Sequence, residues 1–254
     1  EQAAQYLQSE FIKTGLEVKE DPFEWEKGCY RNIMAEKKGE ISPNKVFILG
    51  AHYDTVPGSP GADDNASGIA VLLEIARMIH PFSTNSTVRL IAFSLEESGF
   101  VGSTHCVKKM SQIKERILGM ISLEMVGFTD PVQNYPSSFE QKFYPTMGDF
   151  IGLIGNERSK SLLEKVRQSF KTHIPQLPLE FLIVSGNGEG IEEVRLSDHS
   201  IFWDHGFPAL MITDTSFLRN PHYHLPSDTM ETLDFEFMSK VTVGIFYSIL
   251  ELTK

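Results

Sequence analysis

The chain has 254 residues, of which 23 are Lys or Arg and 34 are Asp or Glu, giving a formal net charge of −11. This acidic balance argues against a nucleic-acid partner, which would require a basic surface. The apolar runs are far shorter than the roughly 18 residues of a membrane span, so no span is expected. Two cysteines do not form a disulfide framework, and a chain this long can bury its core without a metal.

Helix-like and strand-like segments alternate along the chain. The first fifteen residues predict an amphipathic helix, because Ala4, Leu7, Phe11 and Ile12 recur at helical spacing. Strands are predicted at 33–35, 46–50, 88–95, 120–124, 181–184 and 209–213, and further helices at 69–79, 157–172 and 235–252. The alternation predicts an α/β sandwich with a mixed, largely parallel central sheet flanked by helices, in a single domain over residues 1–254.

Residues 129–149 contain three prolines and several aromatic side chains but no period. We interpret them as a long surface loop near the functional site. Tyr135, Phe139, Phe143 and Tyr144 either line an apolar pocket or pack as ordinary loop residues, and the sequence favours neither.

Polar side chains follow several predicted strands directly. His52 and Asp54 come after 46–50, Glu96 and Glu97 follow 88–95, and Glu124 ends 120–124. Ligands of open α/β folds bind beyond the carboxyl ends of the strands. These residues therefore predict the position of a functional site.

The acidic residues in these clusters indicate a bound cation. Asp63 and Asp64 are adjacent in a glycine-bounded loop, and helix capping explains only one of them. The Glu96–Glu97 pair and Glu124, which lies in an apolar run, are costly to bury unless they are paired or bind a metal. Histidine and carboxylate donors without a thiolate suit zinc in a catalytic site.

In order along the chain, these motifs resemble metallopeptidase family 28. They are His-x-Asp at 52–54, Gly-x-x-Asp-x-x-Ser-Gly at 61–68, Glu-Glu at 96–97, Glu124, and Tyr-His-x-x-x-Asp at 223–228. The resemblance covers essentially the whole chain. It implies a three-layer zinc exopeptidase fold and two Zn²⁺ per chain, as in the co-catalytic aminopeptidases of that family.

The resemblance also implies ligands for both metals. His52 and Glu124 would bind the first zinc, Glu97 and His224 the second, and Asp64 would bridge them. The peptide bond after Asp64 would be cis. Many family members have Asp in the position of Glu124, which leaves the denticity of this ligand open.

Four other residues receive roles by the same comparison. Asp54 would orient His52, Glu96 would be the general base, and Tyr223 would donate a hydrogen bond to the oxyanion. Asp198, in a segment that recurs in the family, either contacts the substrate or caps the following helix.

The resulting expectation is an aminopeptidase that hydrolyses peptides with a free N-terminus, preferring apolar first residues. A single-zinc glutaminyl-peptide cyclotransferase, a carboxypeptidase of the same family and a non-catalytic binding domain are the alternatives. The sequence Asp-Asn-Ala-Ser-Gly at 64–68 favours the peptidases, and the complete ligand set disfavours the binding domain. Family members are often exported and the chain starts at Glu1, so a periplasmic or secreted location is favoured.

Overall fold

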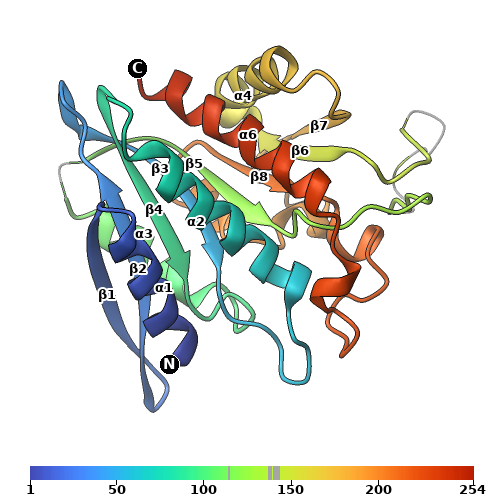
Figure 1. The fold of residues 1–254 in the computed structure, drawn as a ribbon, viewed down its shortest axis with the longest axis horizontal. Helices are drawn as coiled ribbons and strands as arrows, with labels where there is room; N and C mark the ends of the chain where they lie inside the picture. The colour runs from blue at the N-terminus through green and yellow to red at the C-terminus, as the bar shows by residue number, and fades with distance from the viewer. Residues whose placement is uncertain (114, 137–138, 140–143) are drawn as a thin grey trace.

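The computed structural model describes residues 1–113, 115–136, 139 and 144–254. Its centre is an eight-stranded sheet with the order β1-β2-β4-β3-β5-β8-β6-β7 (Figure 1). The strands are β1 (Glu17–Trp25), β2 (Gly28–Lys37), β3 (Ser42–His52), β4 (Ser86–Phe93), β5 (Arg116–Glu124), β6 (Ile151–Asn156), β7 (Leu179–Val184) and β8 (Ala209–Thr213). The four central strands are mutually parallel, whereas β1–β2, β2–β4 and β6–β8 pair antiparallel. The prediction of a mixed, largely parallel sheet is confirmed.

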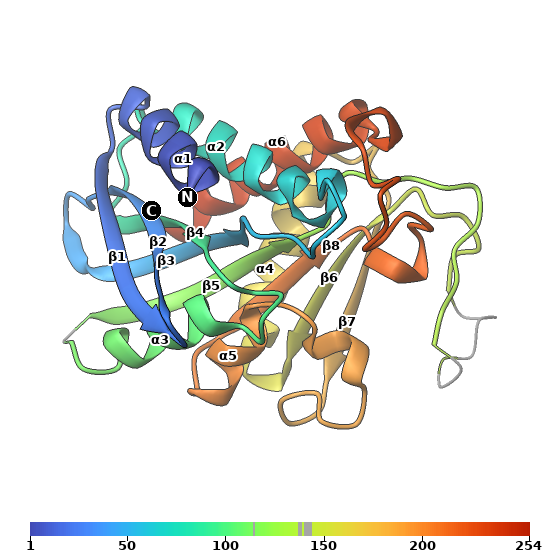
Figure 2. The ribbon, with the colours of Figure 1, turned by 90° about the horizontal axis from the view of Figure 1, so that it is seen from below.

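Helices cover both faces of this sheet, which confirms the three layers (Figure 2). One face carries α1 (Gln2–Lys13), α2 (Gly68–Ile79), α4 (Lys160–His173) and α6 (Phe235–Leu252), and the other carries α3 (Val101–Met110) and α5 (His199–Asp204). Among the described residues, no helix combines the length and apolar character needed to cross a membrane.

Strand β3 shows how the two faces are filled. Phe47 and Leu49 pack into the core under α2 and α6, whereas Val46 and Ile48 pack into the core under α3 and α5. Successive side chains of a strand point to opposite faces, so a continuous apolar run is buried on both sides. The strand is thereby fixed, and with it the position of His52 at its end.

Three elements depart from the sequence prediction. Strand β1 was not predicted because it is a polar edge strand with only Asp21 and Phe23 buried. Strand β6 was missed because two glycines interrupt its apolar residues. Helix α3 has little apolar periodicity and was missed as well.

Candidate metal centre and adjoining pocket

The carboxyl ends of the parallel strands bring the predicted residues together. His52 is the last residue of β3 and Glu124 the last of β5, while Glu96 and Glu97 follow β4 closely. His52 is in register with Phe93 of β4, and Gly50 is in register with Ser122 of β5. The sheet thus holds these side chains at one edge, as expected for parallel strands.

Two groups of metal-ligand atoms meet at this edge. Nε2 of His52 lies 3.3 Å from Oδ1 of Asp64 and 3.5 Å from Oε1 of Glu124. Nε2 of His224 lies 3.1 Å from Oδ2 of the same Asp64 and 3.2 Å from Oε2 of Glu97. The ligand atoms of each group lie within 4.8 Å of one another. Asp64 therefore offers one carboxylate oxygen to each group.

These groups fit tetrahedral zinc. Zinc–ligand bonds of about 2.0–2.1 Å place neighbouring ligand atoms about 3.3 Å apart, close to the separations measured here. Buried atoms of all five residues also lack a hydrogen-bond partner: His52 Nε2, Asp64 Oδ2, Glu97 Oε1, Glu124 Oε2 and His224 Nε2. Buried polar atoms are rarely left unpaired, and bound cations would satisfy these.

Asp54 supports the centre differently from the expectation. The Nδ1 atom of His52 lies 3.0 Å from the main-chain carbonyl of Asp54 but 3.8 Å from its carboxylate. Because a carbonyl only accepts, Nδ1 donates and Nε2 is left free for a metal. The Asp54 carboxylate instead accepts hydrogen bonds of 3.1 Å from the main-chain amides of Glu96 and Glu97. One residue thus positions groups from both sides of the centre.

Hydrogen bonds to its main-chain amides fix the loop that carries Asp64. The Asp228 carboxylate accepts hydrogen bonds from the main-chain amides of Asp63 and Asp64, at 2.9 and 3.2 Å. Asp63 binds the amide of Gly127 and the side chain of Asn220, and it belongs to neither ligand group. The peptide bond between Asp64 and Asn65 is cis, as the resemblance implied.

The carboxylates of the centre shift one another's protonation. Burial, followed by repulsion from Asp64, raises the pKa of Glu97 to about 8. Burial also raises the pKa of Glu96 and of Glu124. Burial alone would lower the pKa of His52, but Glu96 and Glu124 raise it above its usual value. The centre therefore attracts positive charge, whether protons or metal ions.

Glu96 and Tyr223 lie beside the ligand groups without belonging to them. Both line a cavity of about 310 Å³ that opens next to Asp64, Glu97 and Glu124. Burial and the nearby acids raise the pKa of Tyr223, so its hydroxyl keeps its proton at neutral pH and can donate. His222 is outside the ligand groups, and its Nδ1 atom lies 2.9 Å from the hydroxyl of Ser227.

Asp198 differs from both expectations. It is fully buried and is not among the residues that line the cavity, so its carboxylate is not exposed to a substrate there. It precedes α5 but makes no capping hydrogen bond, and both of its carboxylate oxygens lack a partner. Burial raises its pKa to about 7.

The backbone takes unusual angles around the centre. Leu95, Met125 and His224 have positive φ angles of 58°, 50° and 60°. Residues other than glycine rarely adopt positive φ angles, and those that do are concentrated at functional sites. Each of these residues is a proposed ligand or lies within two positions of one, which suggests that ligand placement has overridden backbone preference.

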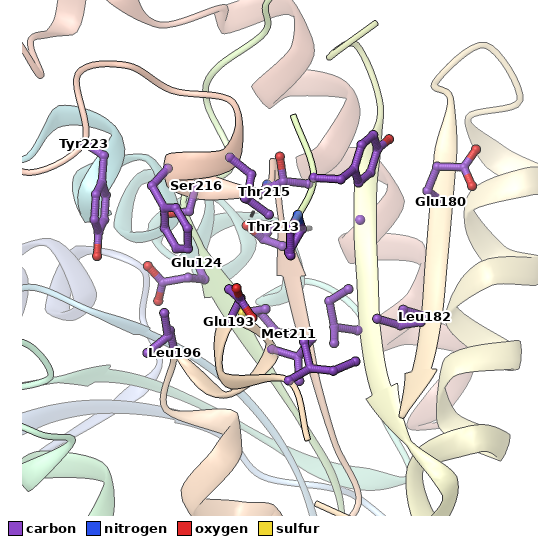
Figure 3. Close-up of a pocket in the computed structure, with 18 of the residues that line it drawn as sticks. Glu124, Glu180, Leu182, Glu193, Leu196, Met211, Thr213, Thr215, Ser216 and Tyr223 are labelled. Carbon is purple, nitrogen blue, oxygen red and sulfur yellow. Dashed lines mark hydrogen bonds between the residues drawn. The ribbon is translucent and has the colours of Figure 1, made fainter. Parts of the chain in front are cut away.

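Two cross-strand rows form the floor of the cavity. Glu124, Thr213, Gly152 and Glu180 are aligned across β5, β8, β6 and β7, and the next row on the same face contributes Met211, Ile154 and Leu182. Figure 3 shows the cavity extending from Glu124 and Tyr223 towards Leu182 and Glu180, with Glu193 and Met211 between them. Gly152 and Glu180 were not predicted as site residues because only strand register brings them together. Glu193 was not predicted either, because it reaches the cavity from the short helix Glu192–Arg195, outside the sheet.

The long loop supplies the upper wall. Tyr135, Phe139 and Tyr144 line the cavity, and the ring centroids of Tyr135 and Tyr144 are 5.2 Å apart. Of the two interpretations of these aromatics, the structure supports the pocket. Phe143 lies outside the described residues.

A three-layer α/β sandwich with two histidine–carboxylate groups at its strand ends has the architecture of a metal-dependent hydrolase. The chain belongs to peptidase family M28, whose model matches residues 32–249. It is therefore a member of a family of hydrolytic enzymes, and the family resemblance seen in the sequence is confirmed.

Individual relatives agree with this assignment. The chain is 34% identical to the uncharacterized protein YfbL of Escherichia coli, over 96% of this chain and 77% of that protein. It is similar to BSAP, a zinc aminopeptidase from Bacillus subtilis, with 28% identity and a TM-score of 0.70, covering 91% of this chain and 52% of BSAP. A glutaminyl cyclase from Porphyromonas gingivalis shares the fold at 20% identity and a TM-score of 0.73, over 97% of this chain and 88% of that one. The chain spans about half the length of BSAP and of two fungal probable zinc metalloproteases.

Proposed function

We propose that the protein is a two-zinc aminopeptidase that releases the first residue from peptides with a free N-terminus. The observation that carries this proposal is the pair of ligand groups sharing Asp64. His52, Asp64 and Glu124 would hold one Zn²⁺, and Asp64, Glu97 and His224 the other. The similarity to a zinc aminopeptidase supports the same metal.

Bound zinc would polarise the scissile carbonyl and make water more acidic, which lowers the barrier to hydrolysis. Glu96 lies at the cavity wall next to the ligand Glu97 and takes the proton of the attacking water. It then returns that proton to the nitrogen of the leaving peptide. The protonated hydroxyl of Tyr223 donates a hydrogen bond to the oxyanion.

The acidic lining of the cavity supports recognition of a free amine. Six carboxylates line it, and none of its described lining residues is Lys, Arg or His. A peptide's α-ammonium group is attracted to such a surface, whereas an acetylated N-terminus is not. Exopeptidase action follows from this requirement.

A substrate panel tests the proposal on the zinc-loaded protein. It contains aminoacyl chromogenic amides, their N-acetylated forms, dipeptides ending in glutamate, and a peptide beginning with glutamine. We expect cleavage of the free-amine amides alone and two zinc ions per chain by metal analysis.

Other outcomes of this panel would contradict the proposal, and most of them would indicate a different function. Equal cleavage of acetylated amides would contradict amine recognition, and release of C-terminal glutamate alone would indicate a carboxypeptidase. Cyclisation of the glutaminyl peptide with one zinc per chain would indicate a cyclotransferase. Failure to bind any metal would favour a non-catalytic binding domain.

A further inference from the structure

The cavity contains acidic charge that the metal centre does not account for. Two zinc ions would offset the four carboxylates of Asp64, Glu96, Glu97 and Glu124. Glu180 and Glu193 also line the cavity, and no cationic side chain among its described lining residues compensates them. Both are half-buried, and neither side chain forms a hydrogen bond or ion pair with any other part of the chain that the structure describes.

The position of Glu180 suits the end of a substrate side chain. It lies three strands from Glu124 in the same cross-strand row, a separation of about 14 Å between main chains. The residue between Thr213 and Glu180 in that row is Gly152, so no side chain blocks the path. Figure 3 shows Glu180 at the opposite end of the cavity from Tyr223, and Glu193 closer to Glu124.

The walls along this path are apolar. Met211, Ile154 and Leu182 form the neighbouring row of the floor, and Tyr135 also lines the cavity. Such walls favour an aliphatic stem, and the carboxylates favour a positive charge at the tip. Lysine and arginine side chains combine both properties.

We propose that this cavity selects peptides whose first residue has a long aliphatic side chain ending in a positive charge, recognised by Glu180 and Glu193. The inference rests on the proposed aminopeptidase function. A neutral apolar side chain would displace water from these carboxylates without forming hydrogen bonds in its place, which is unfavourable. An ammonium or guanidinium group replaces that water with charge-assisted hydrogen bonds. Burial also raises the pKa of Glu180, consistent with a carboxylate that lacks a cationic partner.

The test compares lysine and norleucine p-nitroanilides, which share a four-carbon stem and differ in the terminal ammonium. The wild-type zinc-loaded enzyme should have a higher kcat/KM for the lysine amide than for the norleucine amide. In the double variant Glu180→Gln/Glu193→Gln, the ratio of lysine to norleucine kcat/KM should fall about tenfold to hundredfold. Norleucine hydrolysis should change much less than lysine hydrolysis, and the single variants apportion the effect between the two carboxylates.

Glu192→Gln is the matched control, because Glu192 is exposed, adjacent to Glu193 and absent from the cavity lining. It changes the net charge as much as either single variant does, and it should leave the ratio unchanged. A double variant with the wild-type ratio, or an equal loss for both substrates, would overturn the inference. Norleucine release by the wild-type enzyme keeps these outcomes separate from a failure of the proposed function, in which neither amide is cleaved.

Discussion

The metal centre and the adjoining cavity lie at the same edge of the sheet but depend on the sequence in different ways. The centre is built from short motifs at strand ends, and its carboxylates are chemically unusual for buried positions. The cavity floor is built from one ordinary residue per strand, and only register places Gly152 between Thr213 and Glu180. Changes in the centre should therefore affect every substrate, whereas changes in the cavity should discriminate between substrates.

The largest expected effect is on turnover, within the centre. Glu96→Gln keeps the side-chain size but removes the proton acceptor, so kcat should fall by about two to four decades with the zinc content unchanged. Metal analysis and steady-state kinetics on the same preparation measure both quantities.

Its neighbour provides the contrast. Glu97 belongs to a ligand group, so Glu97→Gln should reduce zinc content together with activity. Loss of zinc from Glu96→Gln would contradict the division of roles between the two residues.

Metal removal tests whether the centre also affects stability. The five proposed ligands include three carboxylates that repel one another when no cation is bound. Zinc added to the metal-free protein should raise the free energy of unfolding, by about 4 kcal/mol for each of the two proposed sites when free zinc is a thousandfold above the Kd of that site. Urea denaturation with and without zinc gives the value.

Two histidines of one segment form a matched pair for this measurement. His224→Gln removes a proposed ligand and should reduce the stabilisation, whereas His222→Gln lies outside the ligand groups and should retain it. Equal stabilisation of the two variants would show that His224 does not bind the metal.

A substitution in the cavity floor should act on substrate size. The added side chain in Gly152→Val occupies the path between Glu124 and Glu180, and its Cβ would lie 3.3 Å from the carbonyl oxygen of Thr213. We expect kcat/KM to fall about tenfold to hundredfold for leucine and phenylalanine amides, with the alanine amide little affected. A uniform loss across the series would instead indicate that the change disturbs the metal centre.

The comparison also explains what could be predicted from the sequence. Buried carboxylates such as Glu124 are costly unless they are paired or bind a metal, and short motifs recognised by their resemblance to the family contain all five proposed ligands. By contrast, β6 was not predicted because two glycines interrupt its apolar residues. Without β6, the alignment of Thr213 with Glu180 across the sheet cannot be derived. The role of the Asp54 carboxylate could not be predicted from the sequence either, because it depends on the direction of the main-chain amides of Glu96 and Glu97.

The smallest expected effect concerns a buried histidine in the segment that supports both regions. His199 follows Asp198, and its Nε2 atom lies 2.9 Å from the main-chain carbonyl of Val194, which lines the cavity. Burial lowers its pKa to about 3, against an ordinary value of 6.5. Between pH 6.5 and pH 3, His199 is therefore protonated in the unfolded chain but neutral in the folded protein. Its contribution to the free energy of unfolding is complete above pH 6.5 and declines as the pH falls towards 3.

The variant His199→Gln can still donate to Val194 but does not titrate, so it isolates this contribution. Between pH 7.5 and pH 5.5 the wild type should lose about 1.4 kcal/mol more of its free energy of unfolding than the variant does, because one pKa unit corresponds to that amount. Urea denaturation of both zinc-loaded proteins at the two pH values measures the difference. Parallel pH profiles would show that His199 is protonated as readily in the folded protein as in the unfolded chain, contrary to its burial.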